Sequence, residues 1–260
     1  LNPIYPITKA TLNSIGRLSQ GIRIGLQHGF DSGQSLDHVY TNQAVGLTFV
    51  GQFIDRIYLN SPGWQGIRSR RAIINQLVDK DFTTMPTARV LDIASGNGRY
   101  LFDIMQSHPK ITVEMRDFDD INIQIMESRI ENLELGDRAQ AVQADAFDKD
   151  SYLGNANFDL AIVSGLFELF PDNQLVSSAL EGMANQLTSD GYLLYTNQPW
   201  HPQQEFIART LCNHRAQPWI MRCRSQVEMD TLITQAGLKK VDMMIDPSGM
   251  FSVSIAKKCD

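Results

Sequence analysis

The chain has 260 residues, of which 43% are apolar and 20% charged, and its formal net charge is −6. This length suits one large domain, or a medium domain with an appendage. The acidic balance argues against a general nucleic-acid binder, which carries a basic face. No apolar run approaches the roughly 18–20 residues that a transmembrane helix needs.

The three cysteines include no CxxC pair, so neither a disulfide framework nor a zinc site is indicated. The first residues lack a secretory signal pattern. We therefore expect a cytoplasmic protein. The start at Leu1, without a methionine, suggests a trimmed chain or the C-terminal part of a longer polypeptide.

Residues 1–85 show helical spacing and no strand-like alternation. Apolar residues from Ile15 to Leu26 recur every three or four residues, which predicts a helix. A turn-rich stretch, HGFDSGQS, follows. A second helix is expected over NQAVGLTFVGQFIDRIYL, and a third from near Trp64, after an interruption at SPGW.

From residue 88 onward, short apolar runs rich in β-branched residues alternate with helical patterns. The strands predicted are RVLDIA, ITVEMRDF, AQAVQAD, FDLAIVSG, GYLLYTNQ, KKVDMMID and FSVSIAKK. Five strands that alternate with helices predict a doubly wound parallel sheet. The last two are joined only by Pro-Ser-Gly and must pair as an antiparallel hairpin. Before them, Ser225 and Glu228 form a capping-box pattern, and Gly237 marks the helix end.

The stretch ARVLDIASGNGRYLFDIM, residues 88–105, carries the strongest signal. A strand ends at Asp92, small residues follow at 94, 96 and 98, and a helical pattern resumes. Such a turn serves either as a tight strand-to-helix connection or as a ligand-binding loop. A dinucleotide-binding turn needs a third small residue where Leu101 stands, and a P-loop needs a lysine that is absent.

This stretch resembles motif I of the class I S-adenosylmethionine (SAM)-dependent methyltransferases, D-x-(G/A)-x-G-x-G. Residues without large side chains let the backbone approach the methionine and ribose parts of SAM. A carboxylate at the strand end complements the ammonium group. The resemblance implies that SAM, which leaves as S-adenosylhomocysteine, is bound by Asp92, Ala94, Ser95, Gly96 and Gly98.

Acids follow the next two strands as well. In the family, an acid at the end of the second strand reaches the ribose hydroxyls. Asp117, with Phe118 beside it, is the better match, and Asp119 is the alternative.

After the third strand, in QADAFD, the family places an acid on the adenine amino group. Here that acid is Asp145, with Ala146 and Phe147 flanking the ring. An ordinary turn acid is the alternative interpretation of Asp145.

The resemblance covers residues 88 to about 258 and implies a Rossmann-like seven-stranded sheet of order 3-2-1-4-5-7-6, whose last strand is antiparallel. We assign residues 1–85 to an N-terminal helical cap that covers the substrate, and residues 86–260 to the SAM-binding domain. Three stretches are similar to a bacterial group of methyltransferases often fused behind an α/β-hydrolase domain: DRIYLNSPGWQGIRSRR, SGLFELFPDN and YTNQPWHPQ. A fused or partner hydrolase domain is therefore expected.

Several acceptor classes lack their signatures. The (N/D)-P-P-(Y/F) motif of amino-group methylation is absent after the fourth strand, which ends in SGLF. Ser164 and Asn197 stand where metal-dependent enzymes place acids, so no Mg²⁺ cage is expected. We expect a small-molecule or lipid-like acceptor, methylated at oxygen or nitrogen, with no nucleic acid and no metal. Ser164 is assigned to the cofactor site.

The candidates for catalysis are Glu168, His201 and Tyr58. Glu168 could face the transferred methyl, or could be an ordinary helix-start acid. His201, which follows Trp200, could accept a proton, or could be a supporting or exposed histidine. Tyr58 could close the site from the cap.

Trp64 and Arg68 are further candidates from the cap. Arg68, Arg70 and Arg71 could equally form a solvated helix face. An inward Arg68 would suit a carboxylate or phosphate on the acceptor.

Two other functional classes compete with a methyltransferase. One is a SAM-binding module that no longer methylates and serves a regulatory or partner role. The other is a nicotinamide-dependent oxidoreductase on a related sheet, against which Asp92 and Leu101 argue.

Overall fold

The computed structural model describes residues 3–82, 85–154 and 157–259, and the chain forms two compact units. Unit 1 comprises residues 1–69 and 200–221, and unit 2 comprises residues 70–199 and 222–260. This division differs from the boundary expected at residue 85. Helix α5 (Pro62–Phe82) contributes to both units, and residues 200–221 return to unit 1.

Unit 2 is built on a sheet whose order, among the described residues, is β3-β2-β1-β4-β5-β7-β6. Strands β1 to β5 pair in parallel, whereas β7 is antiparallel to both β5 and β6. The expected Rossmann-like order and hairpin are therefore confirmed. The strands are β1 (Arg89–Ile93), β2 (Thr112–Asp117), β3 (Ala139–Gln143), β4 (Phe158–Val163), β5 (Leu187–Asn197), β6 (Leu238–Ile245) and β7 (Ser252–Lys258).

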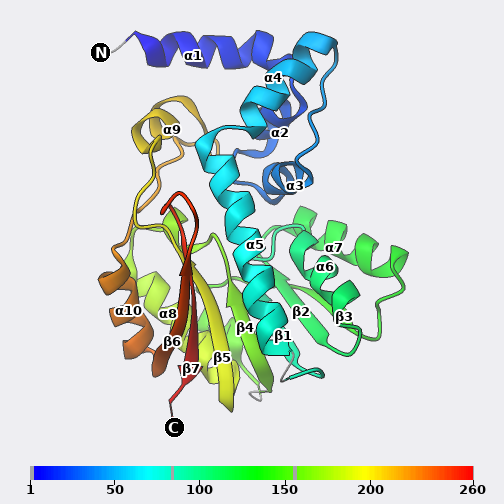
Figure 1. Ribbon diagram of the computed structural model, residues 1–260, viewed down its shortest axis with the longest axis vertical. Coiled ribbons are helices and arrows are strands. Elements are labelled where there is room, and N and C mark those ends of the chain that lie inside the picture. Colours follow the sequence, from blue (N-terminus) through cyan, green and yellow to red (C-terminus); the bar gives the residue numbers. More distant parts are fainter. Residues whose placement is uncertain (1–2, 83–84, 155–156, 260) are drawn as a thin grey trace. The chain divides into compact units, whose positions relative to one another are not determined.

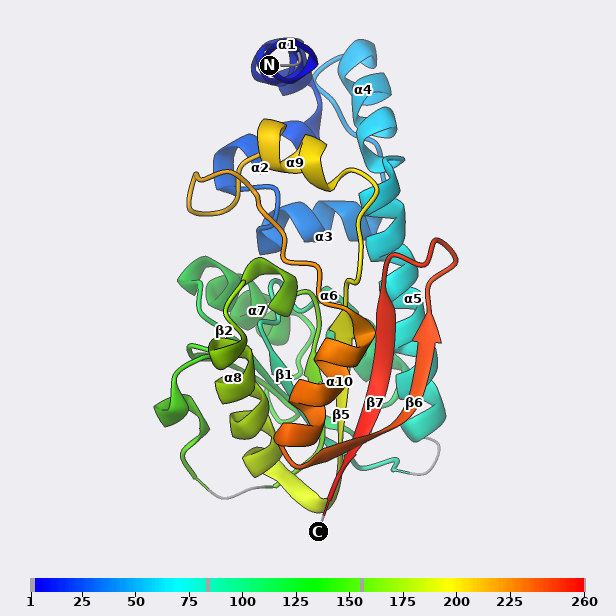
Figure 2. The same cartoon turned by 90° about the vertical axis from the view of Figure 1, so that its left-hand side faces the viewer.

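Helices cover both faces of this sheet (Figures 1 and 2). One apolar core joins the sheet to the unit 2 part of α5 and to α6 and α7; the other joins it to α8 and α10. These elements are α6 (Arg99–Ser107), α7 (Asp120–Asn132), α8 (Asn173–Gln186) and α10 (Gln226–Gln235), with the short helices η2 (Lys149–Tyr152) and η3 (Phe167–Leu169).

The central strands read as continuous apolar runs because both of their faces are buried. In β4, Leu160 belongs to the first core and Ala161 to the second, since successive side chains of a strand point to opposite faces. In β1, Val90 and Leu91 divide in the same way. The parallel arrangement places the carboxyl ends of β1 to β4 at one edge of the sheet, where such folds bind ligands.

The cap of α10 follows the sequence pattern in part. The Ser225 hydroxyl accepts a hydrogen bond from the Glu228 amide at 3.1 Å. The Glu228 carboxylate pairs with Arg222 at 2.6 Å instead of turning back to the Ser225 amide, so half of the capping box forms. Gly237 ends the helix with a φ of +77°, a conformation that favours glycine.

Unit 1 is helical (Figure 2). Helices α2 and α4 pack with each other and with η1, and α1 packs with α9. Its elements are α1 (Ile4–Asn13), η1 (Ile15–Leu18), α2 (Gln20–His28), α3 (Gly33–Thr41), α4 (Phe49–Leu59), the start of α5, and α9 (Gln204–Thr210). Throughout the described part of the chain, no helix has the length and hydrophobicity needed to cross a bilayer.

Three expectations for this region need correction. The helix expected from Ile15 is broken at Ser19, whose hydroxyl caps α2. The turn-rich stretch contains the start of α3, because Ser32 is its N-cap. The interruption expected at SPGW lies between Leu59 and Pro62, but α5 begins at Pro62 rather than near Trp64, since proline suits the first helical position.

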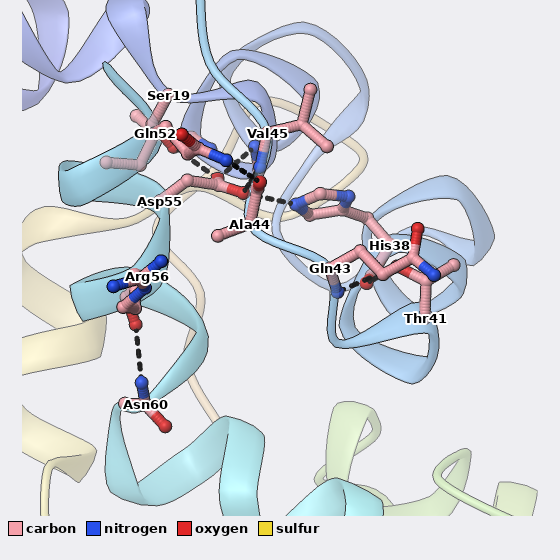
Figure 3. A network of polar contacts seen from close by, with 12 residues as sticks. Ser19, His38, Thr41, Gln43, Ala44, Val45, Gln52, Asp55, Arg56 and Asn60 are labelled. Atoms are coloured by element: carbon pink, nitrogen blue, oxygen red, sulfur yellow. Dashed lines mark hydrogen bonds and ion pairs between the residues drawn. The ribbon is translucent and has the colours of Figure 1, made fainter. Parts of the chain in front are cut away.

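A fully buried carboxylate holds the core of unit 1 together (Figure 3). Asp55 on α4 accepts hydrogen bonds from the Ser19 hydroxyl (2.6 Å), the Gly21 amide (2.7 Å), the His38 Nε2 (2.9 Å) and the Val45 amide (2.9 Å). Burial raises the pKa of Asp55, but the hydrogen bonds outweigh it, and the net shift is downward. One side chain thereby links α2, α3, α4 and the loop before α4.

Candidate functional site

The turn after β1 adopts an unusual backbone conformation. Ala94, Gly96 and Gly98 all have positive φ, at +58°, +56° and +64°. The left-handed region costs little for glycine and more for alanine, and such strain is common at ligand sites. A Cβ on Gly98 would lie 2.8 Å from the Met115 Sδ, so glycine is needed there for packing as well.

Asp92, at the end of β1, is buried and incompletely satisfied. Its Oδ1 accepts a hydrogen bond from the Tyr100 hydroxyl, and its Oδ2 has no partner among the described residues. Burial raises the pKa of Asp92 to about 7, against which Ser95 and Tyr100 act, and nearby Asp117 raises it further. An unpaired buried carboxylate oxygen is costly unless a ligand supplies the donor.

Two other side-chain oxygen atoms near Asp92 are also buried without a hydrogen-bond partner among the described residues. In the described part of unit 2, the Asn97 Oδ1 in the same turn and the Ser164 Oγ at the end of β4 are also buried without partners. Arg129 of α7 fixes the turn by donating to the Asn97 main-chain oxygen at 2.7 Å. The carboxyl ends of β1 and β4 thus present side-chain oxygen atoms that no described residue pairs.

Asp117, at the end of β2, is buried and holds the turn in place. Its Oδ2 accepts from the Gly96 amide at 2.8 Å, and its Oδ1 accepts from the Asp119 amide (2.9 Å) and the Asn122 side chain (3.0 Å). Asp119 instead caps α7 by accepting from the Ile121 amide. Of the two candidates, the structure places Asp117 against the glycine turn and uses Asp119 as a helix cap.

Asp145 lies in the loop after β3. Its Oδ1 accepts from the Phe147 amide at 2.9 Å, and the Ala146 oxygen accepts from the Tyr152 hydroxyl at 2.8 Å. The Phe147 ring packs edge-on against Phe170, with 4.4 Å between centroids. The loop is therefore ordered by its own side chains.

Main-chain hydrogen bonds join these strand ends. The Ser95 amide donates to the Arg116 oxygen at 3.0 Å, and the Ala144 amide donates to the Asp117 oxygen at 2.9 Å. Phe118 is exposed beside them. The structure therefore brings the sequence-predicted cofactor residues of β1, β2 and β3 to one edge of unit 2.

Glu168 is buried on η3, in an ion pair with Arg70 whose Nη1 lies 3.3 Å from its Oε1. Arg70 is only 2% exposed, stacks over the Phe251 ring at 4.9 Å, and lies against Gly165. The hypothesis of a solvated face is therefore wrong for Arg70. Arg71, half-buried, pairs with Asp103.

In unit 1, His201 is buried and neutral at pH 7. Burial lowers its pKa to about 4, and its Nδ1 accepts from the Gln203 amide at 3.0 Å. Its Nε2 faces the first turn of α5, where a Cβ on Gly63 would lie 2.9 Å away. Trp200, the residue before His201, is 46% exposed.

Tyr58 belongs to an aromatic cluster of unit 1, which we define as Tyr58, Trp64 and Trp219. Tyr58 meets Trp64 edge-on at 5.5 Å, and Trp64 stacks on Trp219 at 5.9 Å. In the described chain, the Tyr58 hydroxyl, the Trp219 Nε1 and the Arg68 Nη1 are buried without hydrogen-bond partners. Burial, helped by the charge of Asp55, raises the pKa of Tyr58 well above its ordinary value.

Sequence reasoning did not find several residues that shape these sites. Tyr100, Asn97 and Trp219 carry no motif of their own, and Arg70 looked like one of a run of surface arginines. Only the spacing of Tyr100, eight residues after Asp92 across the turn, could have indicated its contact with that carboxylate.

The sheet order, the hairpin and the loops at the strand ends define a Rossmann-like methyltransferase fold. The chain belongs to the family described as "Putative methyltransferase", which matches residues 2–258. It is 40% identical over 270 residues to the uncharacterized protein YnbC of Escherichia coli K12. That match covers all of this chain and 46% of YnbC, so the chain spans about half the length of this relative.

Solved structures share the fold at low sequence identity. A possible exported protein from Bordetella parapertussis is 16% identical with a TM-score of 0.72, covering 97% of both chains. Magnesium protoporphyrin IX methyltransferase from Synechocystis PCC 6803, solved with S-adenosylhomocysteine, is 12% identical with a TM-score of 0.64, covering 90% of this chain and 98% of that one. The SAM-dependent methyltransferase SibL is 14% identical with a TM-score of 0.62, covering 99% and 78%.

Proposed function

We propose that the protein binds SAM at the strand ends of unit 2 and transfers a methyl group to a small-molecule or lipid-like acceptor, at oxygen or nitrogen. The observation that carries this proposal is the buried Asp92 Oδ2, which has no hydrogen-bond partner among the described residues, beside a turn with three positive-φ residues. When bound, SAM supplies an ammonium group and an electrophilic sulfonium methyl. Asp92 would accept a charge-assisted hydrogen bond from that ammonium group, which offsets the cost of burying the carboxylate.

The turn itself would form the floor of the site. Ala94, Ser95, Gly96 and Gly98 expose main-chain atoms to a ligand, because small side chains leave the backbone accessible. The Ser164 hydroxyl, buried and unpaired within the described residues, would complete the cofactor contacts at the end of β4.

The nucleoside would be held by the next two strand ends. A carboxylate has about four acceptor sites, and Asp117 uses three of them within the protein. The fourth is available for a ribose hydroxyl. Asp145 would accept from the adenine amino group, with Phe118, Ala146 and Phe147 beside the ring.

The aromatic cluster of unit 1 would recognise the acceptor. Its planar apolar rings lie in the same unit as the Tyr58 hydroxyl, the Trp219 Nε1 and the Arg68 Nη1, which have no hydrogen-bond partner within the described chain. Burial also lowers the pKa of Arg68, so its charge lacks full solvation. An acceptor with a planar apolar part could pack on the aromatic rings, and an anionic oxygen on it could pair with the Arg68 guanidinium.

We propose limited roles for the catalytic candidates. His201, neutral at pH 7, can accept a hydrogen bond from an acceptor O–H or N–H, but a pKa of about 4 makes it a weak base. Glu168, held by Arg70, and Tyr58 would position groups rather than exchange protons. Methyl transfer by in-line displacement depends mainly on such positioning.

Isothermal titration with SAM and with S-adenosylhomocysteine tests the donor site directly. We expect both to bind with one site per chain, and the D92A variant to bind them more weakly. Tight binding of NADH without binding of SAM would contradict the proposal and favour the oxidoreductase alternative.

A second candidate function is a SAM-binding module without turnover. The ion pair that engages Glu168 and the low basicity of His201 favour it, because these two of the three predicted catalytic groups are poorly suited to proton transfer. Incubation with SAM labelled on its methyl group, together with metabolite and lipid extracts, separates the two. Label in any acceptor excludes the module, whereas SAM binding with no labelled product in any extract favours it.

From the sequence resemblance we also propose a hydrolase partner domain and a cytoplasmic location. The match to YnbC leaves more than half of that relative outside the aligned part. Mass spectrometry of the endogenous polypeptide, combined with cell fractionation, tests both proposals.

A further inference from the structure

Helix α4 exposes a continuous row of large apolar side chains. Phe49, Val50, Phe53 and Ile57 are exposed by 92%, 56%, 61% and 60%. Because each residue turns an α-helix by about 100°, these four positions lie within an arc of about 100°. The opposite side carries the fully buried Asp55. We call the four exposed side chains the α4 apolar face.

The fold of unit 1 explains the buried side of α4 but not this face. Asp55 anchors the helix through four hydrogen bonds, and Gly51 lies so close to Leu18 that a Cβ would come within 2.2 Å of the Leu18 oxygen. A surface helix normally turns its apolar stripe toward the core. Contiguous exposed apolar side chains on a folded protein instead mark a binding surface.

Exposed cations lie on α4 and on the two elements at the start of unit 1. Arg56 lies on α4 itself, next to Ile57, while Lys9 and Arg17 lie on α1 and η1, which packs with α4. All three are exposed, and no ion pair is formed by them within the described chain. Between residues 3 and 30 the sequence contains no acidic residue at all.

The acids of unit 1 do not cancel this charge near α4. Asp55 is buried, Asp31 pairs with His214, and Asp37 is half-buried on α3. Glu205 is paired with Arg209. Its side chain is the most exposed acid among the ion pairs of this unit. Unit 1 as a whole carries a net charge of +3, although the whole chain has −6.

We propose that unit 1 docks on an anionic lipid bilayer through the α4 apolar face, with Phe49 and Phe53 entering the headgroup region and Lys9, Arg17 and Arg56 facing lipid phosphates. An interfacial helix binds by burying apolar side chains while flanking cations are attracted to anionic lipid. The charges favour this occupant over a second copy of the chain. A symmetric dimer through this face would bring identical cations together, which is repulsive.

Vesicle flotation with the purified chain tests the docking. We expect binding to vesicles that contain phosphatidylglycerol, and much less to vesicles of phosphatidylcholine alone. Salt at about 1 M, where the Debye length falls to about 3 Å, should weaken the binding. The variant F49S/F53S should bind at least about tenfold more weakly, because two aromatic side chains no longer leave water.

The matched control is V227S/V241S, which removes two apolar side chains that are exposed by 76% and 53% in unit 2. It should bind vesicles like the unaltered chain. Thermal unfolding of both variants should match the parent, since all four side chains are exposed. Failure of the parent to bind anionic vesicles, or equal loss in V227S/V241S, would overturn the proposal. So would a concentration-dependent dimer in sedimentation that F49S/F53S abolishes while vesicle binding persists.

Discussion

The candidate sites of the two units differ in the buried polar atoms that have no hydrogen-bond partner among the described residues. At the strand ends of unit 2 these atoms are oxygens of Asp92, Asn97 and Ser164, whereas in unit 1 they are donors of Arg68 and Trp219 together with the Tyr58 hydroxyl. Unit 1 carries seven Lys and Arg against four Asp and Glu, so the rest of the chain has a net charge of −9. Unit 2 therefore suits a cationic ligand such as SAM, and unit 1 suits anionic ones.

The polar core of unit 1 offers the largest expected effect. Asp55→Ala should lower the free energy of unfolding by about 3–5 kcal/mol, because four donors, one of them His38, lose a buried carboxylate. Urea denaturation measures this loss. Asp55→Asn keeps the shape and should cost less. If D55A removes SAM binding as well, although its unit 2 remains folded, the assignment of SAM to unit 2 alone is wrong.

The second-largest effect is expected for substitutions at Asp92, in the proposed SAM site of unit 2. Asp92→Ala should weaken SAM binding by roughly 1.5–3 kcal/mol, the scale of a hydrogen bond to a charged group. Asp117→Ala should do the same and should also loosen the turn through the lost Gly96 contact. Calorimetry measures both affinities. Unchanged affinity in both variants would defeat the proposed cofactor site.

The pH dependence of SAM binding gives a smaller effect. Since the pKa of Asp92 is raised to about 7 from 3.8, the carboxyl is largely protonated below about pH 7 and cannot fully complement an ammonium group. SAM affinity should therefore rise by up to about tenfold from pH 6 to pH 8. The same raised pKa means that the stability contributed by the neutral carboxyl falls as the pH rises through about 7. D92N should abolish the slope in calorimetric titrations, and a slope that persists in D92N would contradict the assignment.

The smallest effect distinguishes the two acids after β2. Asp119→Ala removes the N-cap of α7 and should cost about 1 kcal/mol of stability in a denaturant titration. SAM affinity should remain unchanged, because the ribose contact is assigned to Asp117. A loss of affinity as large as that in D117A would reverse this assignment.

Local patterns were sufficient for unit 2 and insufficient for unit 1. The central strands β1 and β4 of unit 2 are buried on both faces, so each is a recognisable apolar run, and the family resemblance ordered the sheet. In unit 1 the helices are short and their cores are partly polar. Ser19 and Ser32 look like turn residues in a sequence but act as N-caps in the structure, which is why η1, α2 and α3 were not separated correctly.

The sequence by itself determined the positions of Asp92, Asp117 and Asp145 at three successive strand ends, because a parallel sheet converts that order into one edge. Only the tertiary structure decided that Arg70 is buried against Glu168, and that residues 200–221 return to unit 1. It also decided that α4 turns Asp55 inward and Phe53 outward. These features depend on contacts between residues far apart in the chain, which no local spacing encodes.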